Sequence, residues 1–432
     1  MKFKILILFL IWFLFCGNVF AQSLSDNLDC LMEANPLSKT SVIAVKVIEK
    51  DSKKIIYQKN SSFLLHPAST MKVATSAVVL DTLGSDYILK TALYEFEGRL
   101  HLKLCGDPFL TSDDLKNLFE NVDLSKYDTL VIDNSAIDNE FYDEGWMWDN
   151  LVSDDNPPYS VFNLDKNLIS LKIVPDKKTD SVQILCDYPV VIANELCIGK
   201  KNNINIEKRP WQNPDAVYIF GTVCSACSTK ISSPNPEKYF LHALYKSMPN
   251  FQGKIFYGSV PVCANLLSVK ETKLMDVLSD QNKNSNNLAA STMLKLAAGK
   301  ALGQGTMKNA QKLFWDFWGK NNFIMADASG LSHKNLLSCD FLCDALWRMS
   351  KNSAFISTLS VAGKDGTLRS RLKEVSLFGK TGTISGVSGL CGYLKTECGN
   401  DYIFAILIQN YKGSAKPAKQ LEDSIVRELN KF

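Results

Sequence analysis

The sequence predicts an α/β (α+β) domain that is built from both ends of the chain and interrupted by a β-rich block. Three observations support this. The chain has 432 residues, which is too long for one ordinary domain. Helical and hairpin patterns alternate near both ends. Between residues 93 and 256, short strand-like runs and polar turns replace them. We therefore expect residues 22–92 and 257–432 to form one discontinuous domain, with one or two β-rich domains inserted.

The composition is that of a globular protein. Hydrophobic residues make up 46% of the chain and charged residues 22%, so a sizeable core is available. The 48 basic and 45 acidic residues leave a net charge of only +3. Proteins that bind nucleic acid concentrate positive charge, so this balance gives no indication of a nucleic-acid partner.

Residues 1–21 are predicted to be a signal peptide. Lys2 and Lys4 precede an unbroken apolar run over residues 5–16, and small residues suited to signal peptidase end at Ala21. The alternative is an N-terminal membrane anchor, but the apolar run is shorter than the roughly 20 residues that span a bilayer. We expect the mature protein to be secreted across the inner membrane, into a periplasm.

The first elements of the mature chain are a hairpin and a helix. Residues 41–48 and 55–58 are rich in β-branched and apolar residues on either side of a polar turn, which is typical of a hairpin. Pro67 then opens, and Gly84 closes, a helix over residues 68–83. Its middle is apolar on nearly every side, so we expect this helix to be buried.

Further elements follow from the same patterns. Strands are expected in the inserted block at residues 100–104, 129–132, 168–174, 181–185 and 216–222. Helices are expected at residues 113–121, 236–247, 273–278, 287–302 and 307–318. The chain ends with a hairpin over 389–395 and 402–409, and with an amphipathic helix that carries Leu421, Ile425 and Leu429 on one stripe.

The cysteines predict no metal site. Eleven of the twelve remain after loss of the signal peptide, an odd number that leaves at least one free or paired with another chain. Cys224 and Cys227 form a CxxC pair, but the four histidines do not lie at metal-ligand spacing from it. A local disulfide or two buried thiols are the alternatives for this pair.

Ser69 and Lys72, at the start of the buried helix, are the first candidate catalytic residues. Residues at i and i+3 share a helix face, so the lysine amine can take the serine proton. Burial and the positive end of the helix dipole both favour the neutral amine that a base requires. A second SxxK match, Ser370 to Lys373, lies among charges with nothing to desolvate its lysine, and we interpret it as a chance match.

Two more motifs complete a set. Ser285-Asn286-Asn287 lies in a polar loop between two helical runs, and Lys380-Thr381-Gly382-Thr383 lies in a strand-like stretch near the C-terminus. SxxK, SxN and KTG together are the signature of serine acyltransferases that act on substrates ending in a carboxylate. Taken alone, the first motif would also suit a helix cap and the second a solvated strand end.

In these motifs the chain resembles the D-alanyl-D-alanine carboxypeptidases/endopeptidases of the penicillin-binding protein 4 type, which are class C penicillin-binding proteins of low molecular mass. The interval of 216 positions between Ser69 and Ser285 resembles that group, which carries extra domains there. Family-like phrases also occur at residues 83–87, 106–108, 327–332 and 361–368. The resemblance implies a β-lactamase/transpeptidase-like catalytic domain. One departure is Asn286, where an aspartate is common in the family.

Carried over by position, the resemblance implies a role for each motif residue. It makes Ser69 the nucleophile, Lys72 its base and Ser285 a proton relay. The implied substrate-binding residues are Asn287, Lys380, Thr381, Gly382 and Thr383. The backbone N–H groups of Ser69 and Thr383 are implied to form the oxyanion hole, and Lys380 to lie near the substrate carboxylate. No cofactor is implied.

The implied activity is removal of the terminal D-alanine from peptidoglycan pentapeptides, with hydrolysis of D-alanyl cross-links as a second reaction. Peptidoglycan stem peptides are the implied partners, and β-lactam antibiotics the implied inhibitors. The alternatives are a β-lactamase and a non-catalytic cell-wall-binding or penicillin-sensing protein of the same fold. The insertion contains an acidic cluster that comprises Asp133, Asp138, Asp143 and Glu144. This cluster could bind the free amine of a diamino acid side chain, or it could be a solvated turn. We interpret Gly106-Asp107-Pro108 and residues 327–330 as turns.

Overall fold

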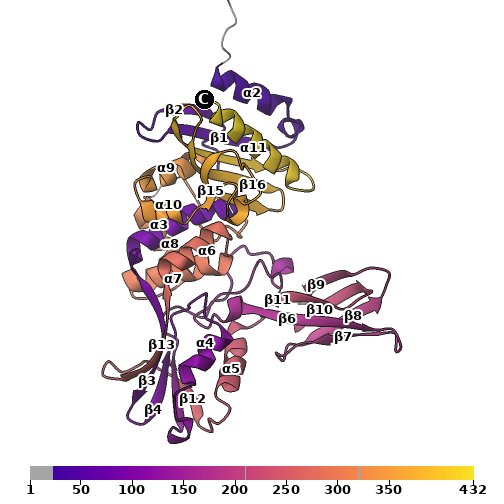
Figure 1. The fold of residues 1–432 in the computed structure, drawn as a ribbon, viewed down its shortest axis with the longest axis vertical. Helices are drawn as coiled ribbons and strands as arrows, with labels where there is room; N and C mark the ends of the chain where they lie inside the picture. Colours follow the sequence, from indigo (N-terminus) through magenta and orange to yellow (C-terminus); the bar gives the residue numbers. More distant parts are fainter. Residues whose placement is uncertain (1–22, 210, 320–321) are drawn as a thin grey trace, which may run out of the picture.

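The computed structural model describes residues 23–209, 211–319 and 322–432. The predicted signal peptide, residues 1–21, lies outside them. Figure 1 shows a body of stacked sheets and helices, from whose side a pair of small sheets extends. Among the described residues, none of the helices has the length and apolar character needed to cross a membrane.

A six-stranded sheet joins the two ends of the chain. Its strands, in order, are β14 (Ser360–Val361), β15 (Ser376–Ile384), β16 (Val387–Lys395), β17 (Asp401–Gln409), β1 (Val42–Glu49) and β2 (Ile55–Lys59). Strand β1 pairs with β17 along its whole length, so the predicted N-terminal and C-terminal hairpins form one sheet. The predicted fold class, an α/β domain built from both ends of the chain, is thereby confirmed.

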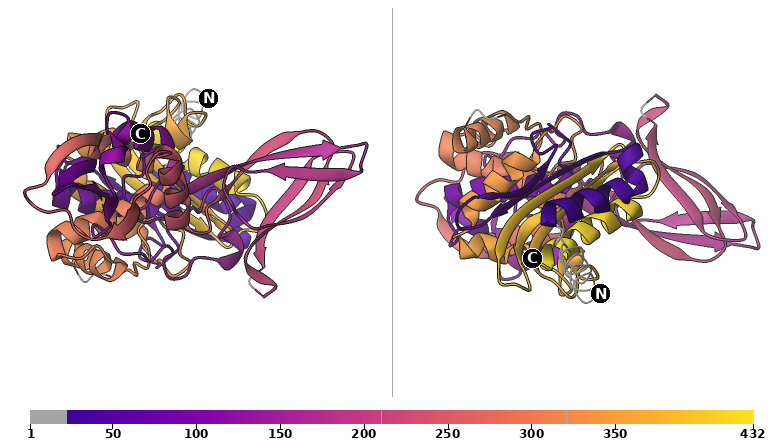
Figure 2. Two further views of the ribbon diagram at one scale, coloured as in Figure 1. Left: turned by 90° about the horizontal axis from the view of Figure 1, so that it is seen from below. Right: turned by 90° about the horizontal axis from the view of Figure 1, so that it is seen from above.

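Helices cover both faces of this sheet. On one face lie α2 (Leu24–Ala34) and α11 (Lys416–Asn430), packed against each other (Figure 2). The other face carries α9 (Cys339–Met349) and α10 (Ser353–Ser357), followed by α3 (Met71–Leu83), α6 (Leu274–Lys283), α7 (Asn287–Leu302) and α8 (Met307–Trp318). Helix α3 contacts α6, α7, α8 and α9. An apolar surface on every side is therefore what its position requires, as the sequence predicted.

The first inserted unit is a five-stranded mixed sheet. Its strands, in order, are β12 (Lys254–Tyr257), β5 (Thr129–Asp133), β4 (Arg99–Lys103), β3 (Ile88–Phe96) and β13 (Asn265–Lys273). Helix α4 (Ser112–Phe119) packs against this sheet, and α5 (Pro236–Ser247) packs against α4. Because β13 pairs with β3, this sheet extends past the boundaries expected at residues 93 and 256.

The second inserted unit consists of the two small sheets that extend sideways in Figure 1. One has the order β8 (Ile192–Ile198), β10 (Asn213–Val223), β9 (Asn203–Arg209), and the other β11 (Cys227–Ser232), β6 (Leu168–Asp176), β7 (Ser181–Leu185). They pack face to face around a core of their own, separate from the main core. Cys224 and Cys227 are half-buried free thiols there, not a disulfide.

Candidate active site

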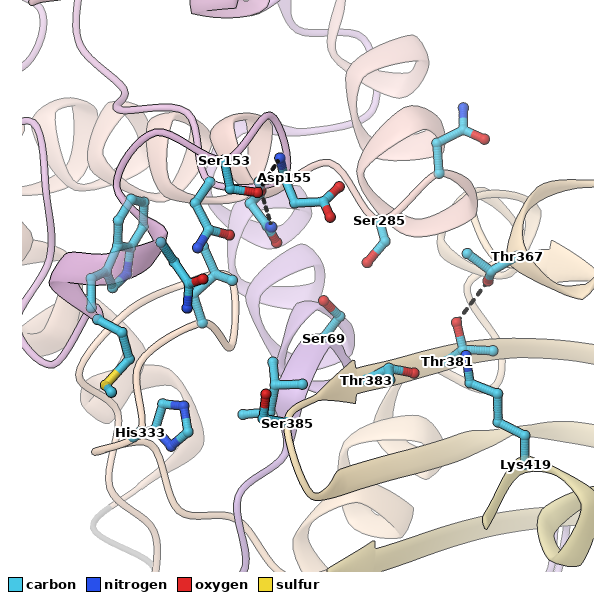
Figure 3. A pocket seen from close by; sticks show the side chains of 18 of the residues that line it. Ser69, Ser153, Asp155, Ser285, His333, Thr367, Thr381, Thr383, Ser385 and Lys419 are labelled. Carbon is cyan, nitrogen blue, oxygen red and sulfur yellow. Dashed lines mark hydrogen bonds between the residues drawn. The ribbon is translucent and has the colours of Figure 1, made fainter. Parts of the chain in front are cut away.

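Ser69 lies in a short 3₁₀ turn, η2 (Ala68–Thr70), directly before α3. The preceding residue, Ala68, has a left-handed backbone with φ 45°, which is rare for a residue with a Cβ and is typical of functional sites. This turn directs Ser69 into the cleft while α3 continues into the core (Figure 3). Lys72 Nζ lies 2.9 Å from Ser69 Oγ, as the spacing of the motif predicted.

Lys72 is fully buried, and its amine has three polar neighbours. Besides Ser69 Oγ, these are Asn287 Oδ1 at 2.6 Å and the carbonyl oxygen of Ser329 at 2.5 Å. Burial, and secondarily the charge of Lys380, hold the pKa of Lys72 well below its usual range, against an opposing effect of Asp327. A neutral amine has two N–H bonds and one lone pair. With two acceptor oxygens taking the N–H bonds, the lone pair is left for the Ser69 hydroxyl proton.

A second lysine–serine pair faces the first. Lys380 Nζ donates to Ser285 Oγ at 3.0 Å and to the carbonyl oxygen of Thr381 at 2.8 Å. Burial lowers the pKa of Lys380 to about 7. Ser285 lies in the loop between α6 and α7, and its left-handed backbone, with φ 62°, turns its hydroxyl toward the cleft (Figure 3). The amine of Lys380 is thus covered, and it is Ser285 that lies between it and the cleft.

Strand β15 forms one side of the site. Thr381 and Thr383 line the cleft, and Thr381 Oγ1 donates to Thr367 Oγ1 at 2.7 Å. Between them, Gly382 lies so close to the η2 turn that a Cβ there would be 3.0 Å from the backbone nitrogen of Ser69. Only glycine allows this approach. The N–H end of the nucleophile turn and the end of β15 therefore border the same space.

The cleft has a volume of about 580 Å³, and its opposite wall comes from the inserted block. Trp146, Asn150, Ser153 and Asp155 all line it. Asn287 ties the two parts together, because its side-chain amide donates to the backbone oxygen of Asp155 at 2.7 Å while its oxygen accepts from Lys72. Figure 3 shows Asp155 and Ser285 on one side of Ser69, and Thr381 and Lys419 on the other.

Comparison with known proteins identifies the family. Residues 24–431 match the model of the D-Ala-D-Ala carboxypeptidase 3 (S13) family. The chain belongs to this family. It is 24% identical to D-alanyl-D-alanine carboxypeptidase DacB of Haemophilus influenzae, over 88% of this chain and 89% of that protein. It is 25% identical to D-alanyl-D-alanine carboxypeptidase of an Actinomadura species, over 95% of this chain and 85% of that protein.

A solved structure confirms the expected fold. Penicillin binding protein 4 (dacB) of Haemophilus influenzae superposes with a TM-score of 0.82 at 23% identity, covering 94% of this chain and 100% of that one. The same protein complexed with a β-lactam gives a TM-score of 0.78 at 22% identity, with the same coverage. The predicted resemblance to the penicillin-binding protein 4 type is therefore confirmed.

Asn286, the departure from the family pattern, has a structural role. Its side-chain oxygen accepts from the backbone N–H of Ala289 at 3.0 Å and so caps α7. Its amide donates to Asp280 Oδ2 at 2.7 Å. An aspartate could cap the helix but could not donate to Asp280, so asparagine suits the carboxylate that this chain carries opposite it. Ser285 and Asn287, on either side, are left facing the cleft.

Two cations at the cleft were missed by the sequence reasoning. Arg371 and Lys419 both line it. The guanidinium of Arg371 forms ion pairs with Glu422 at 2.8 Å and Asp423 at 2.7 Å, which fix its direction. Arg371 lies inside the second SxxK match, whose Ser370 is exposed as expected. The direction of Arg371 is set by its ion pairs with residues of α11, about 50 positions later in the sequence, and a search for local motifs does not detect such pairs.

Asp327 is a further residue that the sequence reasoning underrated. Its buried carboxylate accepts six hydrogen bonds, from the backbone N–H groups of Ser329, Gly330 and Ser332 and from the side chains of Trp146, Ser329 and Asn335. The turn interpretation of residues 327–330 was correct. The turn also presents the Ser329 carbonyl that accepts from Lys72, so it positions the Lys72 amine.

The acidic cluster predicted in the insertion does not face the cleft. Its members are engaged elsewhere: Asp138 pairs with Lys295 at 2.6 Å, Glu144 with Lys334, Asp133 accepts from Ser135, and Asp143 accepts from Tyr159 at 2.5 Å and Ser291 at 3.2 Å. Asp155 is the acidic side chain of the insertion that lines the cleft. Among the described residues, no three His, Cys, Asp or Glu side chains gather as a metal site would require.

Proposed function

We propose that this protein is an exported serine peptidase that removes the terminal D-alanine from peptidoglycan pentapeptides. The observation that carries this proposal is the environment of Lys72. Its buried amine contacts Ser69 Oγ, and its other two partners are acceptor oxygens. Membership of the S13 family, whose relatives are named D-alanyl-D-alanine carboxypeptidases, supports the reaction.

The proposed acylation begins at Ser69. Its hydroxyl proton passes to the lone pair of Lys72 as Oγ bonds to the carbonyl carbon of the penultimate D-alanine. The resulting oxyanion accepts from the backbone N–H groups of Ser69 and Thr383. The C–N bond then breaks, and Ser285, backed by Lys380, delivers a proton to the departing amine. Water releases the acyl group by the reverse proton path.

The substrate carboxylate belongs at the cationic end of the cleft. Thr381 and Thr383 offer hydroxyl donors there, and the ammonium group of Lys419 supplies positive charge. Arg371 lines the same end, with its guanidinium paired with Glu422 and Asp423. Lys380 contributes through Ser285 and Thr381, since its own amine is covered. A free C-terminal carboxylate is the group that this arrangement fits.

The other side of the cleft would hold the stem peptide. Asp155 lies there, and burial raises its pKa, so a cationic partner would restore favourable charge pairing. The free amine of a diamino acid side chain is such a partner. A cross-linked stem peptide presents the same D-alanyl carbonyl to Ser69, so we include hydrolysis of D-alanyl cross-links in the proposal. We propose that the mature enzyme is exported to a periplasm, a location supported by the signal peptide predicted from the sequence.

Chromatography of purified muropeptides after digestion tests the proposal. We expect free D-alanine from pentapeptides and monomers from cross-linked dimers. Ser69→Ala should abolish both products and the labelling by a fluorescent penicillin, and the matched control Ser370→Ala should change neither. Release of the penicillin within seconds would favour a β-lactamase. Intact muropeptides together with stable penicillin labelling would overturn the peptidase assignment in favour of penicillin sensing.

A further inference from the structure

Two tryptophans form an exposed pair beside the cleft. Trp148 begins the short turn η4 (Trp148–Asn150), and Trp211 follows strand β9 in the turn toward β10. Their ring centroids lie 5.1 Å apart with the planes at 80°, an edge-to-face contact. Trp148 is 49% exposed and Trp211 is 67% exposed. Two indole rings held together yet left this accessible form an apolar surface available to a ligand.

The pair is continuous with the catalytic cleft. Trp148 lies between Met147 and Asn150 in sequence, and both of these residues line the cleft. Met147 is itself 44% exposed, so it extends the apolar surface from the cleft wall toward the pair. Strand β9 contacts η4, and the Trp148–Trp211 contact brings Trp211 from the side-projecting unit to the same place. A ligand leaving the cleft along this wall would meet both rings.

The flanking side chains are polar and carry little charge. Asn150 and Gln212 offer amides, and Asp149 is acidic. An anionic membrane surface attracts aromatic residues accompanied by available lysine and arginine side chains. Arg209, two positions before Trp211, is already paired with Glu195 at 2.8 Å and with Glu207 at 2.5 Å. Indole rings with amide neighbours suit a sugar, because a pyranose ring has an apolar C–H face that stacks on an aromatic ring and a polar rim that hydrogen-bonds to amides.

We propose that Trp148 and Trp211 bind the glycan strand of peptidoglycan. The proposal rests on the proposed function, since a stem peptide in the cleft is covalently attached to a glycan strand outside it. The pair holds N-acetylated sugars of that strand while the peptide end reaches Ser69. The polymer is thereby bound at two places, which raises the effective concentration of each stem peptide at the cleft.

Peptide-free glycan strands test the site directly, because they contain no bond that Ser69 could cleave. Binding is measured by titration with the wild-type protein, Trp148→Ala, Trp211→Ala and Trp315→Ala. Trp315 is a matched control: it is 43% exposed and lies on α8. We expect the wild type and the control to bind alike, and each pair variant to bind at least tenfold more weakly. Penicillin acylation of Ser69 should be unchanged in all four proteins.

Several outcomes would overturn the proposal. Failure of the wild type to bind glycan is one, and undiminished binding by both pair variants is another. The pair is only a packing contact if the alanine variants have a lower Tm and weaker penicillin labelling as well as weaker glycan binding. In that case Trp211→Phe should restore the Tm and the labelling but not the glycan binding. If the variants alter self-association in size-exclusion chromatography and not glycan binding, the surface joins two copies of the chain. Intact muropeptides would overturn the proposed function alone, since glycan binding is measured without hydrolysis.

Discussion

At the scale of single residues, the site depends on two buried lysines whose pKa values are lowered by burial, each in different surroundings. Lys72 has acceptor oxygens on two sides and the Ser69 hydroxyl on the third. If it is the general base, Lys72→Arg should fail as severely as Lys72→Ala, because a guanidinium stays protonated at any usable pH. We expect the second-order rate of penicillin acylation to fall roughly 10²- to 10⁴-fold in both variants. Stopped-flow labelling measures it, with Tm as the control for folding. Substantial labelling of the arginine variant would exclude Lys72 as the general base and would leave it only the role of supplying positive charge.

Lys380 carries a prediction about stability. Its native pKa is about 7, whereas in the unfolded chain it returns to the ordinary value near 10.5. Between these values the unfolded state binds the extra proton, so folding becomes more favourable as pH rises. We expect the free energy of unfolding of the wild type, relative to Lys380→Met, to increase between pH 7 and pH 10, by at most about 1.4 kcal/mol per pH unit. Urea titrations at several pH values measure the difference. A constant difference would mean that Lys380 stays protonated in the folded protein.

The sequence predicted which side chains gather at the site, but not every direction in which they point. Ser69 and Lys72 share one helix turn, so local geometry sufficed for that pair. Lys380 was expected to face the substrate, and it is covered, because the position of Ser285 over it depends on a loop from another part of the chain. Arg371 carries no local motif, and its direction is set by α11, some 50 positions away.

At the scale of elements, the turn at Asp327 holds the amine of Lys72 through the backbone carbonyl of Ser329. An asparagine there would direct an NH₂ group at N–H donors in either orientation, since each carboxylate oxygen accepts from at least two of them. We expect Asp327→Asn to lower the free energy of unfolding by about 3 kcal/mol. Penicillin acylation should slow at every pH, because the Ser329 carbonyl is displaced from Lys72.

The matched control is Asp316→Asn, which removes an exposed carboxylate that pairs with Lys312 on α8. An exposed pair of this kind contributes little, so stability and labelling should remain within error of the wild type. Calorimetry and labelling on the same preparations separate the two effects. An Asp327→Asn protein that is destabilised but acylates at the wild-type rate would restrict Asp327 to a structural role.

Elements with strong periodicity were predicted closely, and elements defined by their partners were not. The helices expected at residues 287–302 and 307–318 have those bounds in the structure. Strand β13 was missed because its residues alternate weakly and most are exposed, so that pairing with β3 defines it. Strands β8 and β9 were missed as well; most of their residues are only half-buried, and both lie at the edges of a sheet whose central strand is β10. The alternation of apolar and polar residues in a sequence reflects which side chains are buried, and strands at the edge of a sheet bury few side chains.

At the scale of the whole molecule, the chain combines cores that are separate in space. The two small sheets enclose their own apolar cluster, and their first and last strands, β6 and β11, pair so that Leu168 lies opposite Ser232. The sequence predicted one or two inserted β-rich domains but not where they divide, because short strands of similar texture do not reveal which sheet each one joins.

Because Leu168 and Ser232 are adjacent, residues 169–231 should be removable with a short glycine–serine linker. The main core loses no strand, so we expect the shortened protein to fold with a lower Tm, reflecting newly exposed Val152 and Tyr239, which pack against the small sheets. Ser69 should still react with fluorescent penicillin within about tenfold of the wild-type rate, since the cleft lining is retained. Calorimetry establishes folding, and the labelling time course measures the rate. A folded but unlabelled product would show that the projecting sheets hold the Asp155 wall in place, and that the insertion and the catalytic domain act as one functional unit.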